Sequence, residues 1–189
     1  MLGRESGNVM SHRPIEWYEE TEWLHRALAA DGAFLVVNKP SGAPNPMTIG
    51  WGLVGIGWGV PLFVALVRRD RYTYECVQDA SSFVVSVPEL GELKHALHVC
   101  GTMSGRDSDK PAAAELTMLP AQSVDTPVVA ECRLHYECEI VVRTQQQRSD
   151  FASRRILETV YAHGDNHHQA VFGRIIAAYV TPSPDGTGG

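Results

Sequence analysis

Residues 47–58 read MTIGWGLVGIGW, a stretch in which large apolar side chains alternate with glycine. Alternation of this kind is typical of a β-strand, and glycine inside a strand marks a bend, a bulge or the close approach of another group. The glycines do not stand at a turn from a strand into a helix, so the stretch is not a dinucleotide-binding GxGxxG motif. It predicts a strand against which another group can lie.

The segments on both sides of this stretch continue the β pattern. Strands outnumber helices, and the chain shows no regular alternation of strand, helix and strand. The sequence therefore predicts a mainly β protein, a β-barrel with peripheral helices, rather than a doubly wound fold. Further strands are expected at 32–37, 61–67, 83–87, 128–144 and 170–181, and helices at 15–30, within 68–82, at 88–100, within 101–116 and at 151–161.

Length and composition predict one folding unit. A chain of 189 residues with 44% hydrophobic residues can bury one sizeable core. We expect an N-terminal helical segment over 1–31 and one β-domain over 32–181. A disordered tail is expected over 182–189, because these last residues are mostly proline, glycine and polar side chains.

The net charge of −6 leaves the chain without a general basic field, so nucleic acid is not an expected partner. The first residues lack the apolar stretch of a signal peptide, and no run of about 18 apolar residues could span a membrane. We therefore expect a soluble cytoplasmic protein whose cysteines are reduced and buried, since their spacing suits neither a zinc site nor a CxxC pair. These cysteines are Cys76, Cys100, Cys132 and Cys138.

The densest cationic cluster is formed by Arg68, Arg69 and Arg71, directly after an expected strand. Tyr72 and Thr73 follow it at the start of an expected helix. Guanidinium groups, a hydroxyl and free amides at a helix N-terminus together favour a phosphate site. The alternative is a solvated loop whose arginines bind nothing specific, which is the commoner meaning of a charge run.

Two further segments are candidates for ligand binding. In NPMTIGW, at 45–51, backbone amides and the Thr48 hydroxyl lie beside glycines that let a planar ligand approach the main chain. Core packing is the alternative explanation for its large apolar side chains. In the loop over 100–110, Arg106 and Lys110 are cations among small residues that could reach a phosphate, although such a loop is more often only a turn.

The stretch HGDNHH contains His163, His167 and His168, and its i, i+4 spacing can be interpreted as that of metal ligands. No nearby cysteine or second carboxylate cluster completes a ligand set. We therefore expect no metal site and interpret a histidine here as one wall of a ligand site.

Five blocks of the sequence occur in an order that resembles one known family. They are NPMTIGWG (45–52), RRDRYTYE (68–75), FVVSVP (83–88), CGTMSGRDSDK (100–110) and HHQAVFGRIIAAYV (167–180). Together they resemble the flavin reductase-like, flavoredoxin-like proteins over most of the chain, from about residue 32 to residue 180.

The resemblance implies an FMN-binding split β-barrel over 32–181 and a homodimer that carries flavin near its subunit interface. The apolar segments 34–37 and 61–67 are where such a dimer is expected to bury surface. Two positions depart from the family pattern. Pro46 stands where many relatives have threonine or another residue, and the cationic loop contains Asp70, which would repel a phosphate unless it points away.

The resemblance also implies which residues hold the FMN. Residues of the first block line the isoalloxazine ring, the end of the arginine cluster contacts the phosphate and ribityl chain, a later loop closes over the phosphate end, and a histidine lies beside the flavin. In that order they are Asn45, Met47, Thr48, Ile49 and Trp51; Arg71, Tyr72 and Thr73; Ser104, Gly105, Arg106 and Lys110; and His168.

The implied activity is that of a flavin reductase, in which FMN accepts a hydride from NADH or NADPH. The electrons would pass to free flavin, to an electron carrier or to a partner oxygenase. Hydride transfer through a flavin needs no side-chain general acid or base, so we expect no catalytic side chain. Two alternatives stay open: a flavoredoxin-type electron-transfer protein with tightly bound FMN and no nicotinamide site, and a module that binds another ligand.

Overall fold

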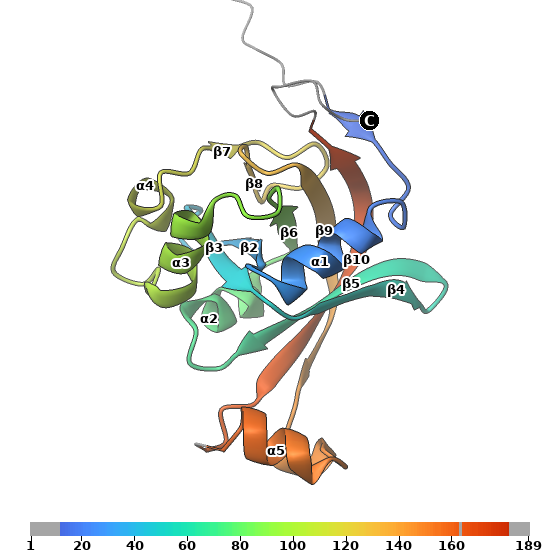
Figure 1. Ribbon diagram of the computed structural model, residues 1–189, viewed down its shortest axis with the longest axis vertical. Helices are drawn as coiled ribbons and strands as arrows, with labels where there is room; N and C mark the ends of the chain where they lie inside the picture. The colour runs from blue at the N-terminus through green and yellow to red at the C-terminus, as the bar shows by residue number, and fades with distance from the viewer. Residues whose placement is uncertain (1–11, 163, 182–189) are drawn as a thin grey trace, which may run out of the picture.

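The computed structural model describes residues 12–162 and 164–181, and its centre is one large antiparallel sheet (Figure 1). The strands follow the spatial order β3-β2-β6-β9-β10-β5-β4, with β1 paired to β10, and a short separate ladder joins β7 to β8. The mainly β fold predicted from the sequence is therefore confirmed. The strands are β1 (Arg13–Pro14), β2 (Ala33–Asn38), β3 (Pro44–Ile49), β4 (Gly52–Gly57), β5 (Val60–Arg68), β6 (Ser82–Val87), β7 (Met118–Leu119), β8 (Val128–Val129), β9 (Leu134–Gln145) and β10 (His168–Val180).

The sheet is open between β3 and β4. These strands follow one another in the chain but stand at opposite ends of the sheet order, β3 paired with β2 and β4 paired with β5. Only Gly50 and Trp51 connect them. The barrel is therefore split at this connection, and the ends of β3, β5 and β10 meet beside it, because His168 at the start of β10 pairs with Arg68 at the end of β5.

The hairpin of β9 and β10 extends from the body of the molecule to the helix α5 (Arg154–Val160) (Figure 1). Its pairing register shifts after Phe172 and after Ile175, as it does at β-bulges. At Gly173 a Cβ atom would lie only 2.6 Å from Cβ of Cys138, so the bulge accepts glycine because it has no side chain.

The strand β2 separates two hydrophobic clusters because successive side chains point to opposite faces. Leu35 and Val37 pack in the main core, to which α1 adds Leu24, whereas Phe34 and Val36 pack in a second cluster together with α3. The helices are α1 (Thr21–Ala29), α2 (Tyr72–Asp79), α3 (Lys94–Thr102), α4 (Lys110–Ala113) and α5, and η1 (Arg148–Asp150) is a 3₁₀ helix.

The structure corrects several predicted boundaries. The stretch 47–58 is not one strand, because Gly50 and Trp51 carry the chain from one end of the sheet to the other. The helix predicted at 88–100 begins only at Lys94, since Gly91 and Leu93 adopt positive φ in the preceding turn. Likewise, the first helix begins at Thr21 rather than at residue 15, and the strand predicted at 128–144 is divided into β8 and β9.

Burial tests two further expectations. The four cysteines are free and buried, as predicted. The segment 34–37 cannot bury surface in a dimer, and that prediction was wrong: its side chains are at most 1% exposed, because both faces of β2 are covered within one chain.

Within the described ranges, no helix is both long enough and apolar enough to cross a membrane. The tail predicted at 182–189 lies outside the described residues.

Candidate functional site

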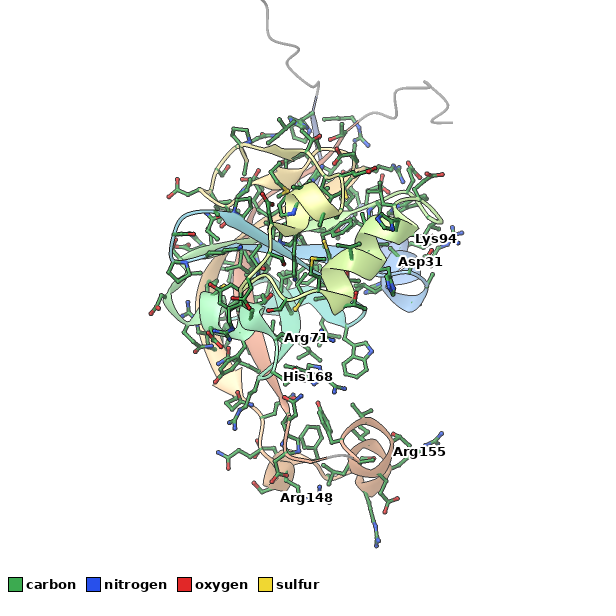
Figure 2. All side chains as sticks on the ribbon, turned by 90° about the vertical axis from the view of Figure 1, so that its left-hand side faces the viewer. Asp31, Arg71, Lys94, Arg148, Arg155 and His168 are labelled. Carbon is green, nitrogen blue, oxygen red and sulfur yellow. The ribbon has the colours of Figure 1, made fainter. Side chains whose placement is uncertain are left out.

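A hollow of about 360 Å³ lies at the opening of the barrel, and we call it the split hollow. One side is formed by the last residues of β3 and by the connection to β4. The other side is formed by the ends of β5 and β10, and Arg71 closes one end. Figure 2 shows Arg71 and His168 close together on this face, between the body of the molecule and the α5 arm. The lining residues are Met47, Thr48, Ile49, Gly50, Trp51, Leu66, Arg68, Arg71 and His168.

A second hollow, of about 190 Å³, adjoins the first, and we call it the cationic hollow. The two share Met47 and Arg71 as lining residues, so they lie side by side, and we call them together the groove. The cationic hollow lies at the N-terminal end of α2 and beneath the loop between α3 and α4. Its lining residues are Met47, Asp70, Arg71, Tyr72, Thr73, Cys100, Thr102, Met103, Ser104, Gly105 and Lys110.

The strand β3 is held in place against α3 on one side of the groove. The hydroxyl of Thr48 donates a 2.6 Å hydrogen bond to the carbonyl of Leu97. Next to it, a Cβ atom on Gly101 would lie 3.4 Å from Cβ of Thr48, so the helix approaches the strand closely at a glycine. The Thr48 hydroxyl hydrogen is thus used within the protein, and the oxygen remains an acceptor for a ligand.

Asn45 lies fully buried under the cationic hollow and supports its floor. Its side-chain amide donates a 2.9 Å hydrogen bond to the hydroxyl of Thr73, in the first turn of α2. Its side-chain oxygen has no partner among the described residues, and Gly105 lies directly above that oxygen. Asn45 therefore joins three segments, β3, α2 and the loop after α3, at one point.

Lys110 brings a positive charge into the cationic hollow although its residue is only 4% exposed. Its ammonium donates hydrogen bonds to the carbonyl oxygens of Pro46, at 3.0 Å, and Cys100, at 3.2 Å. Burial lowers the pKa of Lys110, and the charges of Arg71 and Lys39 act in the same direction. An anion bound here would offset both effects, so the hollow is suited to a negatively charged group.

Arg71 faces both hollows and is held by a 2.8 Å hydrogen bond from its guanidinium to the carbonyl of Gly101. Asp70 also lines the cationic hollow, with its carboxylate 4.0 Å from the Arg71 side chain. The repulsion expected from Asp70 is thus weakened by a neighbouring cation, and Lys110 adds a second cation.

Arg106 is the one predicted site residue in the cationic loops that the structure does not bring to the groove. It lines neither hollow. Its guanidinium forms two hydrogen bonds to the carboxylate of Glu75, one of them 2.9 Å long, and lies 4.9 Å from the centre of the Tyr72 ring. Glu75 therefore neutralises Arg106, which fastens the loop to α2.

His168 forms a wall of the split hollow opposite β3. Its ring centre lies 4.9 Å from that of Trp51, with the two planes tilted by 50°. Burial and, as a smaller effect, the nearby positive charge of Arg68 lower the pKa of His168 to about 4. The ring is therefore neutral at physiological pH.

The other predicted site residues line the groove, except Asn45, and the groove also contains residues that the sequence did not indicate. Met47, Thr48, Ile49 and Trp51 line the split hollow, and Tyr72, Thr73, Ser104 and Gly105 line the cationic hollow. Leu66 and Arg68 share one face of β5, a period-two signal that could have placed them together. Gly50, Arg68 and Asp70 belong to segments already indicated by the sequence, and the lining residues that were missed are Leu66, Cys100, Thr102 and Met103.

Among the residues that the structure describes, no group of three or more His, Cys, Asp or Glu side chains could hold a metal ion. His163, considered above as a metal ligand, lies outside these residues. The chemistry that the groove offers is different: a backbone edge with aromatic walls suits a flat ring system, and two cations beside the start of α2 suit a phosphate.

Sequence comparison places most of the chain in a domain of known type. The family described as "Flavin reductase like domain" matches residues 26–187. An uncharacterized protein of Archaeoglobus fulgidus is 30% identical over 122 residues, which make up 65% of this chain and 67% of that protein.

Solved structures with the same fold include two with informative names. Flavoredoxin from Methanosarcina acetivorans has a TM-score of 0.60 at 25% identity, over 82% of this chain and 72% of that chain. Nitrilotriacetate monooxygenase component B from Bacillus cereus has a TM-score of 0.63 at 16% identity, over 93% of this chain and 83% of that chain. These similarities confirm the predicted split-barrel fold.

Proposed function

Since this chain belongs to the flavin reductase-like family, we propose that its groove binds FMN, with the flavin ring in the split hollow and the phosphate in the cationic hollow. The observation that supports this most strongly is that the two hollows lie side by side and share Met47 and Arg71. A ring site next to a phosphate site matches the two ends of a flavin mononucleotide.

The residues present suit each end of that molecule. At the ring end, the peptide groups of β3 and of Gly50 offer donors and acceptors, while Trp51 and His168 offer ring faces. At the phosphate end, Arg71 and Lys110 supply charge, and Ser104 and Thr73 supply hydroxyl groups. We propose all of these as FMN-binding residues, together with Met47, Thr48, Ile49, Tyr72 and Gly105, with Asn45 supporting the floor and Arg106 fastening the loop.

We further propose that the protein is an NAD(P)H:flavin oxidoreductase. Bound FMN supplies the hydride and electron transfer chemistry, which needs no acid or base from the chain. The chain binds and orients the ring, and Arg68 and Arg71 place positive charge at the split hollow. The hollow is open to solvent along the barrel opening, so a nicotinamide ring has access from that side.

The test is anaerobic reduction of the FMN-loaded protein by NADH and, separately, by NADPH. We expect the visible flavin bands to bleach with at least one nucleotide, faster than the same concentration of free FMN does without protein. If neither nucleotide bleaches the bound flavin, the reductase proposal is wrong. A flavoredoxin-type electron carrier, favoured by the similarity to a flavoredoxin, would then be the better description.

We also propose a homodimer and an acceptor outside the chain: free flavin, an electron carrier or a partner oxygenase. The name of the Bacillus cereus relative, component B of a monooxygenase, supports the oxygenase. The dimer has an available surface on the β4–β5 hairpin, where Leu53 is 63%, Ile56 64% and Trp58 69% exposed. Sedimentation velocity of the FMN-loaded protein should give twice the mass of one chain, and the mass of one chain would contradict the dimer.

A further inference from the structure

Both ring nitrogens of His168 are engaged by neighbours within the chain. The Nε of Arg68 donates a 3.4 Å hydrogen bond to Nε2, and the hydroxyl of Tyr161 lies 2.6 Å from Nδ1. Arg68 comes from the end of β5, whereas Tyr161 follows directly after α5. One imidazole ring therefore connects the barrel to the α5 arm at the edge of the split hollow.

These two contacts determine where the proton of the neutral ring is. A guanidinium is always protonated and can only donate, so Nε2 must accept from Arg68 and cannot carry a hydrogen. The single N–H of the neutral ring is then on Nδ1 and donates to the Tyr161 hydroxyl oxygen. If the ring hydrogen were on Nε2 instead, it would face the Nε hydrogen of Arg68, and the hydrogen bond between them would be lost.

The charged and titratable groups around the ring agree with this assignment. Burial and the charge of Arg68 oppose protonation of His168, and His167 acts in the same direction, whereas Asp70 favours it. Asp70 is exposed and is paired with Arg71, so its effect is weakened. Arg71 also lines the split hollow and adds another positive charge on that side.

Tyr161 is itself held firmly enough to act as an anchor. Only 6% of its surface is exposed. Its ring centre lies 5.2 Å from that of Phe151 and 4.7 Å from that of His167, so it is part of an aromatic cluster at the base of the arm. The orientation of His168 thus depends on packing within the arm as well as on the barrel.

We propose that Arg68 and Tyr161 are positioning residues that hold His168 as the neutral tautomer protonated on Nδ1, so that the ring forms an uncharged wall of the split hollow. Because Nε2 is occupied by Arg68, His168 presents its ring face beside Trp51 rather than a free nitrogen. His168 then neither takes a proton from a ligand nor gives one. The tautomer is a property of the protein without ligand, and only its role as a flavin wall rests on the proposed function.

The direct test is a side-chain ¹H–¹⁵N correlation spectrum of the ¹⁵N-labelled full chain, with His168 assigned by its loss in His168→Gln. We expect a neutral ring protonated on Nδ1 that does not titrate between about pH 5.5 and 7.5, where an ordinary histidine changes charge. A ring protonated on Nε2, or one that titrates in this range, would overturn the proposal. Once His168 is assigned, this spectrum of the wild-type protein decides the matter even if Arg68→Met or Tyr161→Phe fails to fold.

Two variants separate the roles of the positioning residues. In Arg68→Met the proton should move to Nε2, because Tyr161 can then donate to Nδ1, and the pKa should rise toward the ordinary value of about 6.5. In Tyr161→Phe, Arg68 remains and the tautomer should persist. Arg69→Met is the matched control: Arg69 is exposed and lines neither hollow, so this variant should keep the wild-type spectrum. An unchanged tautomer in Arg68→Met would contradict the role of Arg68.

FMN binding is measured on the same samples by visible absorption. If the tautomer is as proposed but no FMN binds, the proposed function fails while the positioning of His168 stands. If FMN binds and the tautomer differs, the proposed function stands while the positioning of His168 fails. Tyr161→Phe should weaken FMN binding several-fold because the ring loses its anchor, and unchanged affinity would contradict the role of Tyr161.

Discussion

Replacing Lys110 with methionine should weaken FMN binding by roughly 10- to 150-fold, the cost of removing one hydrogen bond to a charged group. Riboflavin, which has the same ring but no phosphate, should bind both proteins with nearly equal affinity. Isothermal titration or fluorescence quenching with the two ligands gives the comparison. Methionine keeps most of the length of the lysine stem, so the apolar packing of the side chain is preserved.

The expected loss of affinity follows from the environment of the Lys110 ammonium. It carries three donors, and the described residues provide acceptors, the carbonyls of Pro46 and Cys100, for two of them. The third is available to a ligand in the cationic hollow. Burial lowers the pKa of Lys110, and a phosphate bound beside the ammonium would oppose this effect.

The same lowered pKa predicts a pH dependence with a definite sign. In the ligand-free protein, the unfolded chain binds more protons than the folded one between the pKa of folded Lys110 and the ordinary lysine value. The contribution of Lys110 to the free energy of unfolding therefore rises with pH across that interval. FMN affinity falls over the same interval, because the ammonium loses its proton.

Lys94→Met is the matched control for Lys110→Met, since Lys94 is exposed and lines neither part of the groove. It should leave the affinities for FMN and riboflavin unchanged. If Lys110→Met weakens both ligands equally, the effect is structural and the phosphate is bound elsewhere. If it weakens neither, the cationic hollow is not the phosphate site.

Replacing Gly105 with alanine should lower the free energy of unfolding by roughly 1–3 kcal/mol, the usual cost of overpacking. FMN affinity should fall by about tenfold or more, which corresponds to at least about 1.4 kcal/mol. A Cβ atom at this position would overlap the side-chain oxygen of Asn45 and lie 3.1 Å from its Cγ and 3.4 Å from the Tyr72 ring. Thermal denaturation and FMN titration measure the two effects.

The overlap is costly because Asn45 has nowhere to move. It is fully buried, and its amide is bonded to Thr73 in the first turn of α2. Either that hydrogen bond breaks or the loop lifts away from the cationic hollow. Gly55→Ala is the control, since its Cβ would meet nothing within 4 Å. Wild-type stability and affinity in Gly105→Ala would show that the loop does not close the hollow.

Much of the fold could be predicted because successive side chains of a strand point to opposite faces. In β9, Leu134, Tyr136 and Cys138 alternate with other residues and all lie in the main core. The break after Ile49 could not be predicted, because large apolar residues continue on both sides of it and no local signal marks where one strand ends and the next begins. The path across the opening is determined by pairing with β2 and β5, which are distant in sequence.

The candidate site was predictable where one segment supplies several residues. The residues from 47 to 51 adjoin one another along the chain, and they line one side of the split hollow. Arg106 was less predictable, since its position depends on Glu75, which comes near only when α2 and the loop after α3 pack together. Tyr161 gave no signal in the sequence, because its contact with His168 exists only in the folded arm.

The measurement that most directly tests FMN binding in the groove is a titration of the flavin-free protein with FMN, followed by visible absorption. The two adjacent hollows predict a saturable shift of the flavin bands that ends at one FMN per chain. Flavin bands that stay the same as those of free FMN, with the protein in excess, would contradict FMN binding in the groove.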